Sequence, residues 1–160
     1  MKFFVVEGLD GSGKSTQIEL LQEYFTRKKI QYQYLHFPRT DTGIFGELIA
    51  RFLRGELGNI SHVHPYLVAL IYAGDRKDAA TLINRWLNEK FTVILDRYVY
   101  SNIAFQCAKM NSQPEKDLLK DWIYQLEYEY FKIPKPDLSL FLDVPIAFTK
   151  QKLTDDRTGK

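Results

Sequence analysis

The sequence predicts an α/β fold with a parallel sheet and helices on both of its faces. A glycine-rich loop from Gly8 to Thr16 lies between an apolar run, residues 3–6, and a segment with helical spacing. Two later apolar runs, residues 91–96 and 138–143, each end in an aspartate. Such runs are typical of buried parallel strands, and open parallel sheets bind ligands where their strands end. With 160 residues, the chain is expected to form a single domain over 1–160.

The other elements follow from the spacing of apolar residues. A second strand is expected over 30–36, helices over 43–53, 65–89, 98–109 and 114–130, and a short helix within 145–153. Ser112 is the expected cap of the 114–130 helix, and Gly74 leaves open whether 65–89 is one helix or two. The expected core positions of the helices over 43–53, 65–89 and 114–130 are Ile44, Leu48, Ile49, Phe52, Leu67, Leu70, Ile71, Leu82, Ile83, Trp86, Leu119, Trp122, Ile123 and Leu126.

The glycine-rich loop fits the phosphate-binding pattern G-x-x-x-x-G-K-[ST] at every fixed position, through Gly8, Gly13, Lys14 and Ser15. Glycines allow backbone angles that turn successive N–H groups toward a phosphate. Lys14 can reach the outer phosphates, the Ser15 hydroxyl can hold Mg²⁺, and the following helix adds its positive end. We therefore infer nucleoside triphosphate binding. The alternative, a chance match, is disfavoured by the strand and helix that flank the loop.

Composition excludes several other classes of function. A net charge of +2 is too small to indicate a nucleic-acid partner. No stretch is apolar for long enough to cross a membrane, and nothing at the N-terminus resembles a signal peptide. The single cysteine, Cys107, cannot form an internal disulfide, so a thiol in a reducing cytoplasm is expected.

A first cluster of polar residues follows the strand over 91–96. Asp96 ends that strand, where a carboxylate can meet the magnesium of a bound triphosphate. If a helix begins near Arg97, then Arg97, Ser101 and Phe105 share one face, with Asn102 beside it. The arginine can hold a phosphate and Asn102 can bind a base edge. A solvated arginine with a core phenylalanine is an equally good interpretation of this cluster alone.

Two further clusters can contact a nucleotide. Tyr72 and Arg76 lie four apart on a predicted helix, so a ring can stack on a base while the guanidinium donates to it. In the sequence Phe37-Pro38-Arg39, Arg39 follows a strand and can reach an acceptor phosphate. Taken in isolation, the first cluster is more often a core tyrosine with a surface arginine. The second is more often a surface arginine of a loop.

Taken together, these motifs resemble the thymidylate kinases. The phosphate loop, Phe37-Pro38-Arg39, the segment Tyr72 to Arg76, and Asp96-Arg97-Tyr98 with Ser101-Asn102 occur in the order and spacing of that family. Pro136-Asp137 and Leu142-Asp143-Val144-Pro145 are similar to the family's last core strand. The resemblance covers nearly the whole chain and implies a P-loop kinase fold of three layers.

The resemblance also implies roles for individual residues. Lys14 and the loop from Gly8 through Gly11, Ser12, Gly13, Ser15 and Thr16 would bind the ATP phosphates. Ser15, Asp96 and Asp10 would lie at the magnesium ion, and Arg39 and Arg97 would grip the acceptor phosphate. Tyr72 would stack on the base, Arg76 and Asn102 would bond it, and Phe105 would line the sugar. Phe37 and Ser101 complete the expected acceptor site, and Lys14, Asp10, Arg97 and Arg157 are the expected catalytic residues.

The chain departs from the family pattern in two places. One branch of the family carries a catalytic arginine in the phosphate loop, where this chain has Gly11. The other branch supplies it from a mobile lid, in which Arg157 is the only arginine here and Lys150 and Lys152 are weaker candidates. The chain also ends at Lys160, within the expected lid, as either a fragment or a shortened protein with impaired ATP binding.

The function that the resemblance implies is the magnesium- and ATP-dependent phosphorylation of dTMP to dTDP in deoxynucleotide biosynthesis. The enzyme is expected to be a cytoplasmic homodimer with no nucleic-acid or membrane partner. Three alternatives remain open: a kinase for another nucleoside monophosphate, a deoxynucleoside kinase, and a non-catalytic nucleotide-binding protein. A deoxynucleoside kinase makes Arg39 and Arg97 harder to explain, because its acceptor carries no phosphate.

Overall fold

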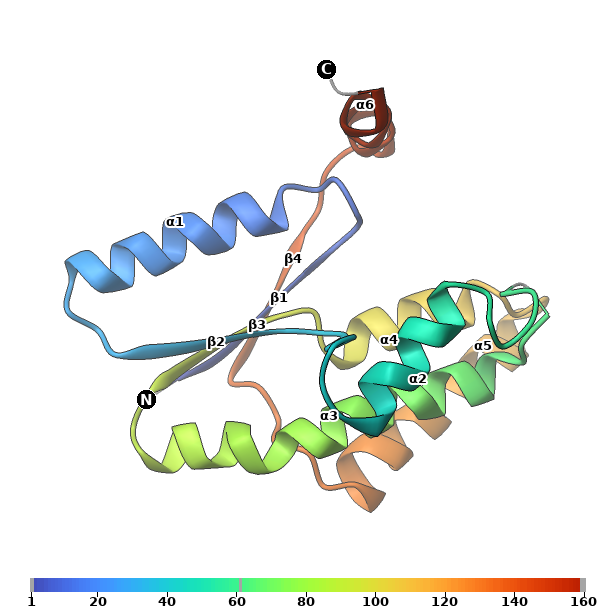
Figure 1. The fold of residues 1–160 in the computed structure, drawn as a ribbon, viewed down its shortest axis with the longest axis horizontal. Coiled ribbons are helices and arrows are strands. Elements are labelled where there is room, and N and C mark those ends of the chain that lie inside the picture. The colour runs from blue at the N-terminus through green and yellow to red at the C-terminus, as the bar shows by residue number, and fades with distance from the viewer. Residues whose placement is uncertain (1, 61, 159–160) are drawn as a thin grey trace. The chain divides into compact units, whose positions relative to one another are not determined.

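The protein is an α/β structure built from four strands and intervening helices within its described residues (Figure 1). This computed structural model describes residues 2–60 and 62–158, without the side chains of 155–158. The elements in chain order are β1 Phe3–Gly8, α1 Lys14–Arg27, β2 Tyr32–His36, α2 Gly43–Leu53, α3 Pro65–Asn88, β3 Thr92–Asp96, α4 Val99–Cys107, α5 Gln113–Tyr124, η1 Gln125–Tyr130, β4 Leu138–Leu142 and α6 Ile146–Thr158.

The described chain forms two compact units. Unit 1 comprises residues 1–35, 86–97 and 136–160, and unit 2 comprises residues 36–85 and 98–135. Unit 1 therefore contains the glycine-rich loop with β1, α1, β3, β4 and α6, whereas unit 2 contains α2, α4, α5, η1 and most of α3. No described helix is both long and apolar enough to span a bilayer.

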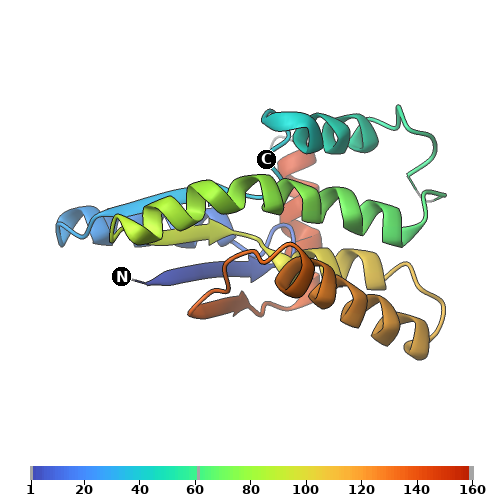
Figure 2. The same ribbon diagram turned by 90° about the horizontal axis from the view of Figure 1, so that it is seen from below.

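The sheet has the order β2-β3-β1-β4 and is seen from a second side in Figure 2. Strand β1 pairs in parallel with β3, Val6 opposite Asp96, and in parallel with β4, Gly8 opposite Leu142. Every residue of β3 is buried, as its mostly apolar sequence predicts. Because parallel strands end at one edge of a sheet, the residues after β1 and β3 are brought together.

Helix α1 packs on this sheet through the apolar stripe that the sequence predicts. Ile18 and Phe25 of the helix join Val6 and Ile94 of the strands in one buried cluster, with Leu21 packed against it. Full burial of a side chain of this size contributes about 1.5–3 kcal/mol. This packing holds the start of α1, and with it the glycine-rich loop, against the ends of β1 and β3.

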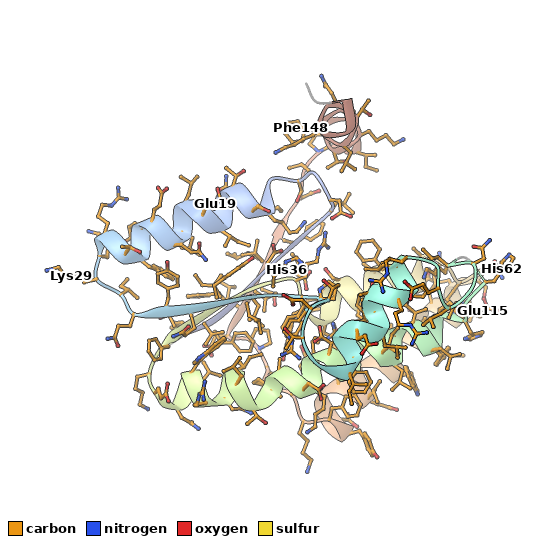
Figure 3. The ribbon with its side chains drawn as sticks, viewed as in Figure 1. Glu19, Lys29, His36, His62, Glu115 and Phe148 are labelled. Atoms are coloured by element: carbon orange, nitrogen blue, oxygen red, sulfur yellow. The ribbon has the colours of Figure 1, made fainter. Side chains whose placement is uncertain are left out.

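In unit 2, the helix boundaries confirm most predictions. Helix α2 spans Gly43–Leu53 as expected, and α3 is one helix that runs through Gly74. Helix α5 begins at a capping box in which the Ser112 side chain accepts from the Glu115 backbone N–H and Glu115 (labelled in Figure 3) accepts from the Ser112 backbone N–H. The predicted helix over 114–130 is correct only as far as Tyr124, because the chain continues as the π-helical segment η1.

Several predicted core positions are wrong. Ile44 is 81% exposed, Leu67 60% and Leu70 38%, whereas the buried positions on α3 are mainly small residues such as Ala69, Ala73 and Ala80. In contrast, Ile49, Phe52, Ile83, Leu119 and Ile123 are buried as expected. Helical periodicity identifies an apolar stripe, but it does not reveal whether the chain itself covers that stripe.

Candidate active site

The glycine-rich loop adopts the backbone that its glycines permit. Gly8, Gly11 and Gly13 have φ values of 155°, 76° and 88°. A Cβ on Gly8 would lie 2.7 Å from Ser12 Oγ and 3.3 Å from Leu142 O, and its φ would be strained for any other residue, so this position favours glycine. Among the described residues, the buried Ser12 Oγ has no hydrogen-bond partner, so it can bond a phosphate oxygen.

Lys14 is folded back onto the loop that carries it. Its Nζ donates to the carbonyl oxygens of Gly8, at 3.1 Å, and Leu9, at 2.9 Å. Burial lowers the pKa of Lys14, and the nearby Arg97 guanidinium lowers it further. A phosphate group would replace two carbonyl dipoles with a full negative charge, and therefore favours the ammonium form strongly.

The residues expected to hold magnesium offer only hard oxygen atoms. Asp96 is 4% exposed at the end of β3, whereas Ser15 and Asp10 are exposed at the loop. Mg²⁺ prefers such oxygens and keeps several waters, with one or two carboxylates and the substrate phosphates as its usual ligands. The donor set therefore fits this ion. The described residues contain no group of three or more His, Cys, Asp and Glu side chains that could hold a metal alone.

Arg97 lies between β3 and α4 rather than on the helix. Helix α4 begins at Val99, and Arg97 has a left-handed φ of 66°, so the prediction that Arg97, Ser101 and Phe105 share a helical face is wrong. Its backbone N–H donates to Val6 O at 2.9 Å, and its Nη2 lies 2.5 Å from Asp10 Oδ1. The end of β3 thus determines the position of the guanidinium, and unit 1 brings Arg97 and Asp10 together.

Arg39, in unit 2, is not a solvated loop residue. Its backbone N–H and its Nε donate to the two carboxylate oxygens of Asp75, at 2.9 and 2.8 Å, and its Nη2 donates to the Asp75 carbonyl at 2.8 Å. The Asp75 carboxylate is 1% exposed and the Arg39 side chain 10%. Asp75 on α3 thereby holds the loop and the guanidinium in one orientation.

Arg76 is buried against a carboxylate from a distant segment. Its Nε and Nη2 donate to the two oxygens of Glu127, at 2.5 and 2.7 Å, in a bidentate ion pair with both side chains at most 2% exposed. Burial alone would lower the pKa of Arg76, but the Glu127 carboxylate outweighs it and the pKa is raised. The Arg76 guanidinium is therefore a permanent, rigidly held cation. The alternative of a surface arginine is wrong.

Asn102 joins the same group. Its Nδ2 donates to Ala69 O at 3.1 Å and to Glu127 Oε1 at 3.2 Å. Since both neighbours are acceptors only, the amide orientation follows from the chemistry: a flipped amide would place an oxygen against two oxygens. Within the described part of the chain, the buried Asn102 Oδ1 has no hydrogen-bond partner. It is an oriented acceptor that a ligand donor can satisfy.

The remaining expected acceptor residues have different degrees of exposure. Phe37 is 1% exposed and packs on Tyr98 at 5.8 Å between ring centroids, so it supports the loop that carries Arg39. Tyr72 and Ser101 are half-buried on α3 and α4, and Phe105 is 48% exposed. The side chain of Arg157 lies outside the described residues, so its predicted role stays a prediction.

Sequence reasoning assigned no role to Asp75 or Glu127, although both hold predicted site arginines. Asp75 lies within the motif that drew attention to Tyr72 and Arg76. Glu127 is separated by steps of four from the core residues Leu119 and Ile123, so helical spacing places this carboxylate on the apolar face of the predicted helix. A charged side chain in that position is rarely buried unless it is paired. A glutamate on an apolar helix face was therefore the sequence signal for a buried ion pair.

The phosphate loop between a parallel strand and a helix, with Asp96 at the end of the neighbouring strand, defines a P-loop nucleotide-binding protein. The thymidylate kinase family model matches residues 6–159. The chain is 32% identical to the thymidylate kinase of Plasmodium falciparum and 34% identical to the human one, alignments that cover 94% and 89% of it. It is 36% identical to a probable thymidylate kinase of Pyrococcus horikoshii over 94% of its length and 69% of that protein. The chain belongs to the thymidylate kinase family.

A solved structure agrees with this assignment. Thymidylate kinase from Candida albicans, described as having broad substrate specificity and a novel structural element, superposes with a TM-score of 0.75 at 26% identity. The match covers 94% of this chain and 66% of the fungal one. The chain likewise spans 65% of the Plasmodium relative and 61% of the human relative.

Proposed function

We propose that the protein transfers the γ-phosphate of ATP to dTMP and forms dTDP, as one kinase domain over residues 1–160. Membership of the thymidylate kinase family supports the reaction type. The phosphate loop supports the donor, because Lys14, Ser12 and the loop amides offer donors to phosphate oxygens. The arginines at 39 and 97 support an acceptor that carries a phosphate, and therefore disfavour a deoxynucleoside.

The observation that carries the choice of base is the pair formed by Arg76 and Asn102. Arg76 can only donate, whereas the oriented Asn102 offers the acceptor Oδ1. Their complement is a base edge with a carbonyl next to an N–H. Thymine and uracil present this edge at O4 and N3, and guanine presents it at O6 and N1. Cytosine and adenine present an amine next to an unprotonated nitrogen, which is the reverse pattern.

In the proposed reaction, the chain's residues act mainly by positioning and by neutralising charge. Lys14 moves from the loop carbonyls to the outer ATP phosphates, and Arg39 and Arg97 hold the acceptor phosphate for in-line attack. Asp10 keeps Arg97 in place until the acceptor binds. Ser15, Asp96 and Asp10 are the residues that would hold Mg²⁺, which when bound neutralises phosphate charge.

Arg157 on α6 is our candidate for the catalytic arginine that the lid would supply. Gly11 supports this division of work because it faces that helix within unit 1. A Cβ on Gly11 would lie 3.1 Å from Thr149 O and 3.3 Å from Leu153 Cγ, and Gly11 has a φ of 76°. An arginine at position 11 would therefore be strained and crowded against α6, which supports a catalytic cation from another segment.

We also propose a cytoplasmic homodimer without a nucleic-acid partner. Ile44 on α2 and Leu67 and Leu70 on α3 are exposed apolar residues in unit 2, and a second copy of the chain would bury them. Sedimentation equilibrium tests this part of the proposal. A dimer that Leu67→Asp converts to a monomer agrees with it, and a wild-type monomer at micromolar concentration refutes it.

An ADP-release assay with the full-length protein tests the reaction. The acceptors are dTMP, dUMP, dGMP, dCMP, AMP and thymidine. We expect dTMP to give the highest kcat/KM, with dCMP, AMP and thymidine at least about a hundredfold lower, because each leaves a buried polar group unpaired or an arginine without its phosphate. A preference for dCMP or AMP refutes the base assignment. The absence of turnover with every acceptor refutes the proposed enzymatic activity.

A further inference from the structure

We propose that Glu127 is a positioning residue that sets the base specificity of the acceptor site by orienting Arg76 and Asn102 at once. This inference rests on the proposed function of those two residues. Glu127 Oε1 accepts from Arg76 Nη2 and from Asn102 Nδ2, and Oε2 accepts from Arg76 Nε. One carboxylate thus determines which atom of each partner remains available to a ligand.

The carboxylate leaves complementary atoms on its two partners. The bonds to Glu127 use Nε–H and one N–H of Nη2 of Arg76, so Nη1 and the second N–H of Nη2 remain to donate to a base carbonyl. On Asn102 they use the amide nitrogen, so Oδ1 is left to accept from a base N–H. A carboxylate cannot donate, and it therefore excludes the flipped amide that would suit cytosine.

Glu127 lies in a backbone segment of uncommon geometry. The chain changes from α-helix to the π-helical segment η1 at Gln125, and Glu127 is its buried residue. Such segments are rare and occur frequently at functional sites. The segment brings the carboxylate to Arg76, 51 residues earlier in the sequence.

Stability alone gives little reason for this arrangement. Replacement of a buried ion pair by apolar residues of similar volume is often neutral or stabilising, because the pair merely offsets the cost of removing its charges from water. The Asn102 Oδ1 atom adds a further cost in the absence of a ligand. A role in recognition explains why the buried charges and the unsatisfied acceptor occur in one cluster.

Glu127→Gln tests the proposal, because its amide keeps the shape but can donate to a flipped Asn102. Glu129→Gln is the matched control, since Glu129 is an exposed glutamate of the same segment. The readout is the ratio of kcat/KM for dTMP to kcat/KM for dCMP in the full-length protein, together with KM for ATP and the melting temperature. We expect E127Q to lower the ratio at least about tenfold through a higher KM for dTMP, with KM for ATP unchanged. E129Q should match the wild type.

A purely structural role gives a different result. An E127Q protein that melts at a lower temperature but retains the wild-type ratio within twofold overturns the proposal. If E127Q does not fold, Glu127→Asp carries the same test: it keeps the charge but withdraws the carboxylate, and the ratio should again fall, whereas an unchanged ratio overturns the proposal. A wild type that prefers dCMP or does not use dTMP refutes the proposed function itself and is recognised before any variant is compared.

Discussion

A single methyl group at Gly46 should displace the loop that carries Arg39. Gly46 is buried on α2, and a Cβ built there lies closer than 3.0 Å to the Arg39 carbonyl oxygen and 3.2 Å from its carbon. Because non-bonded heavy atoms are most stable at about 3.5–4.0 Å, the carbonyl must retreat by at least about 1 Å. The hydrogen bond from Thr42 N–H to that carbonyl would be strained as well.

The effect of Gly46→Ala on stability is the difference between two destabilising contributions and one stabilising contribution. Overpacking against backbone costs about 1–3 kcal/mol, and the weakened hydrogen bond costs about 1 kcal/mol. The higher helix propensity of alanine stabilises the folded state by about 1 kcal/mol. We therefore expect the free energy of unfolding to fall by about 1–3 kcal/mol in urea titrations.

The effect of the same change on activity should be larger. A displacement of about 1 Å in a positioning group can reduce the rate about a hundredfold, so kcat/KM for dTMP should fall by roughly 10- to 100-fold while KM for ATP stays within twofold. Glu47→Ala is the control, since Glu47 is the exposed next residue of the same helix. If G46A equals or exceeds the wild type in stability and keeps its KM for dTMP, α2 does not hold the Arg39 loop as described.

Two other predictions concern the phosphate loop and helix α5. Because burial and Arg97 lower the pKa of Lys14, its ammonium form is lost at a lower pH than that of a free lysine. The affinity for ATP, measured by calorimetry, should therefore decline as pH rises from neutrality toward 10.5. The Lys14→Met variant should bind ATP weakly and without this decline. An equal decline in both proteins contradicts the role of Lys14 in phosphate binding. Ser112→Ala removes the acceptor of the capping box and should lower the free energy of unfolding by about 1 kcal/mol, with kinetics unchanged. An unchanged unfolding midpoint would show that the cap does not contribute.

Much of unit 1 could be predicted from sequence because its signals are local. The phosphate loop is specified by residues adjacent in the chain, and the glycines at 8 and 13 adopt the positive φ values that the motif requires. The carboxylate at the end of β3 was equally predictable from its apolar run. Arg97 was not, because its left-handed backbone separates it from the helix that follows.

In unit 2, the sequence by itself determined which side chains we propose for recognition, namely the ring at 72, the arginines at 39 and 76, and the amide at 102. Only the tertiary structure decided how these groups are oriented, through Asp75 and Glu127. It also decided that Ile44 on α2 and Leu67 on α3, both predicted to be buried, remain exposed. The physical reason is that a hydrogen bond is directional: a residue type fixes what can be donated or accepted, but its partner, 36 residues away for Arg39 and 51 for Arg76, fixes which atoms remain available.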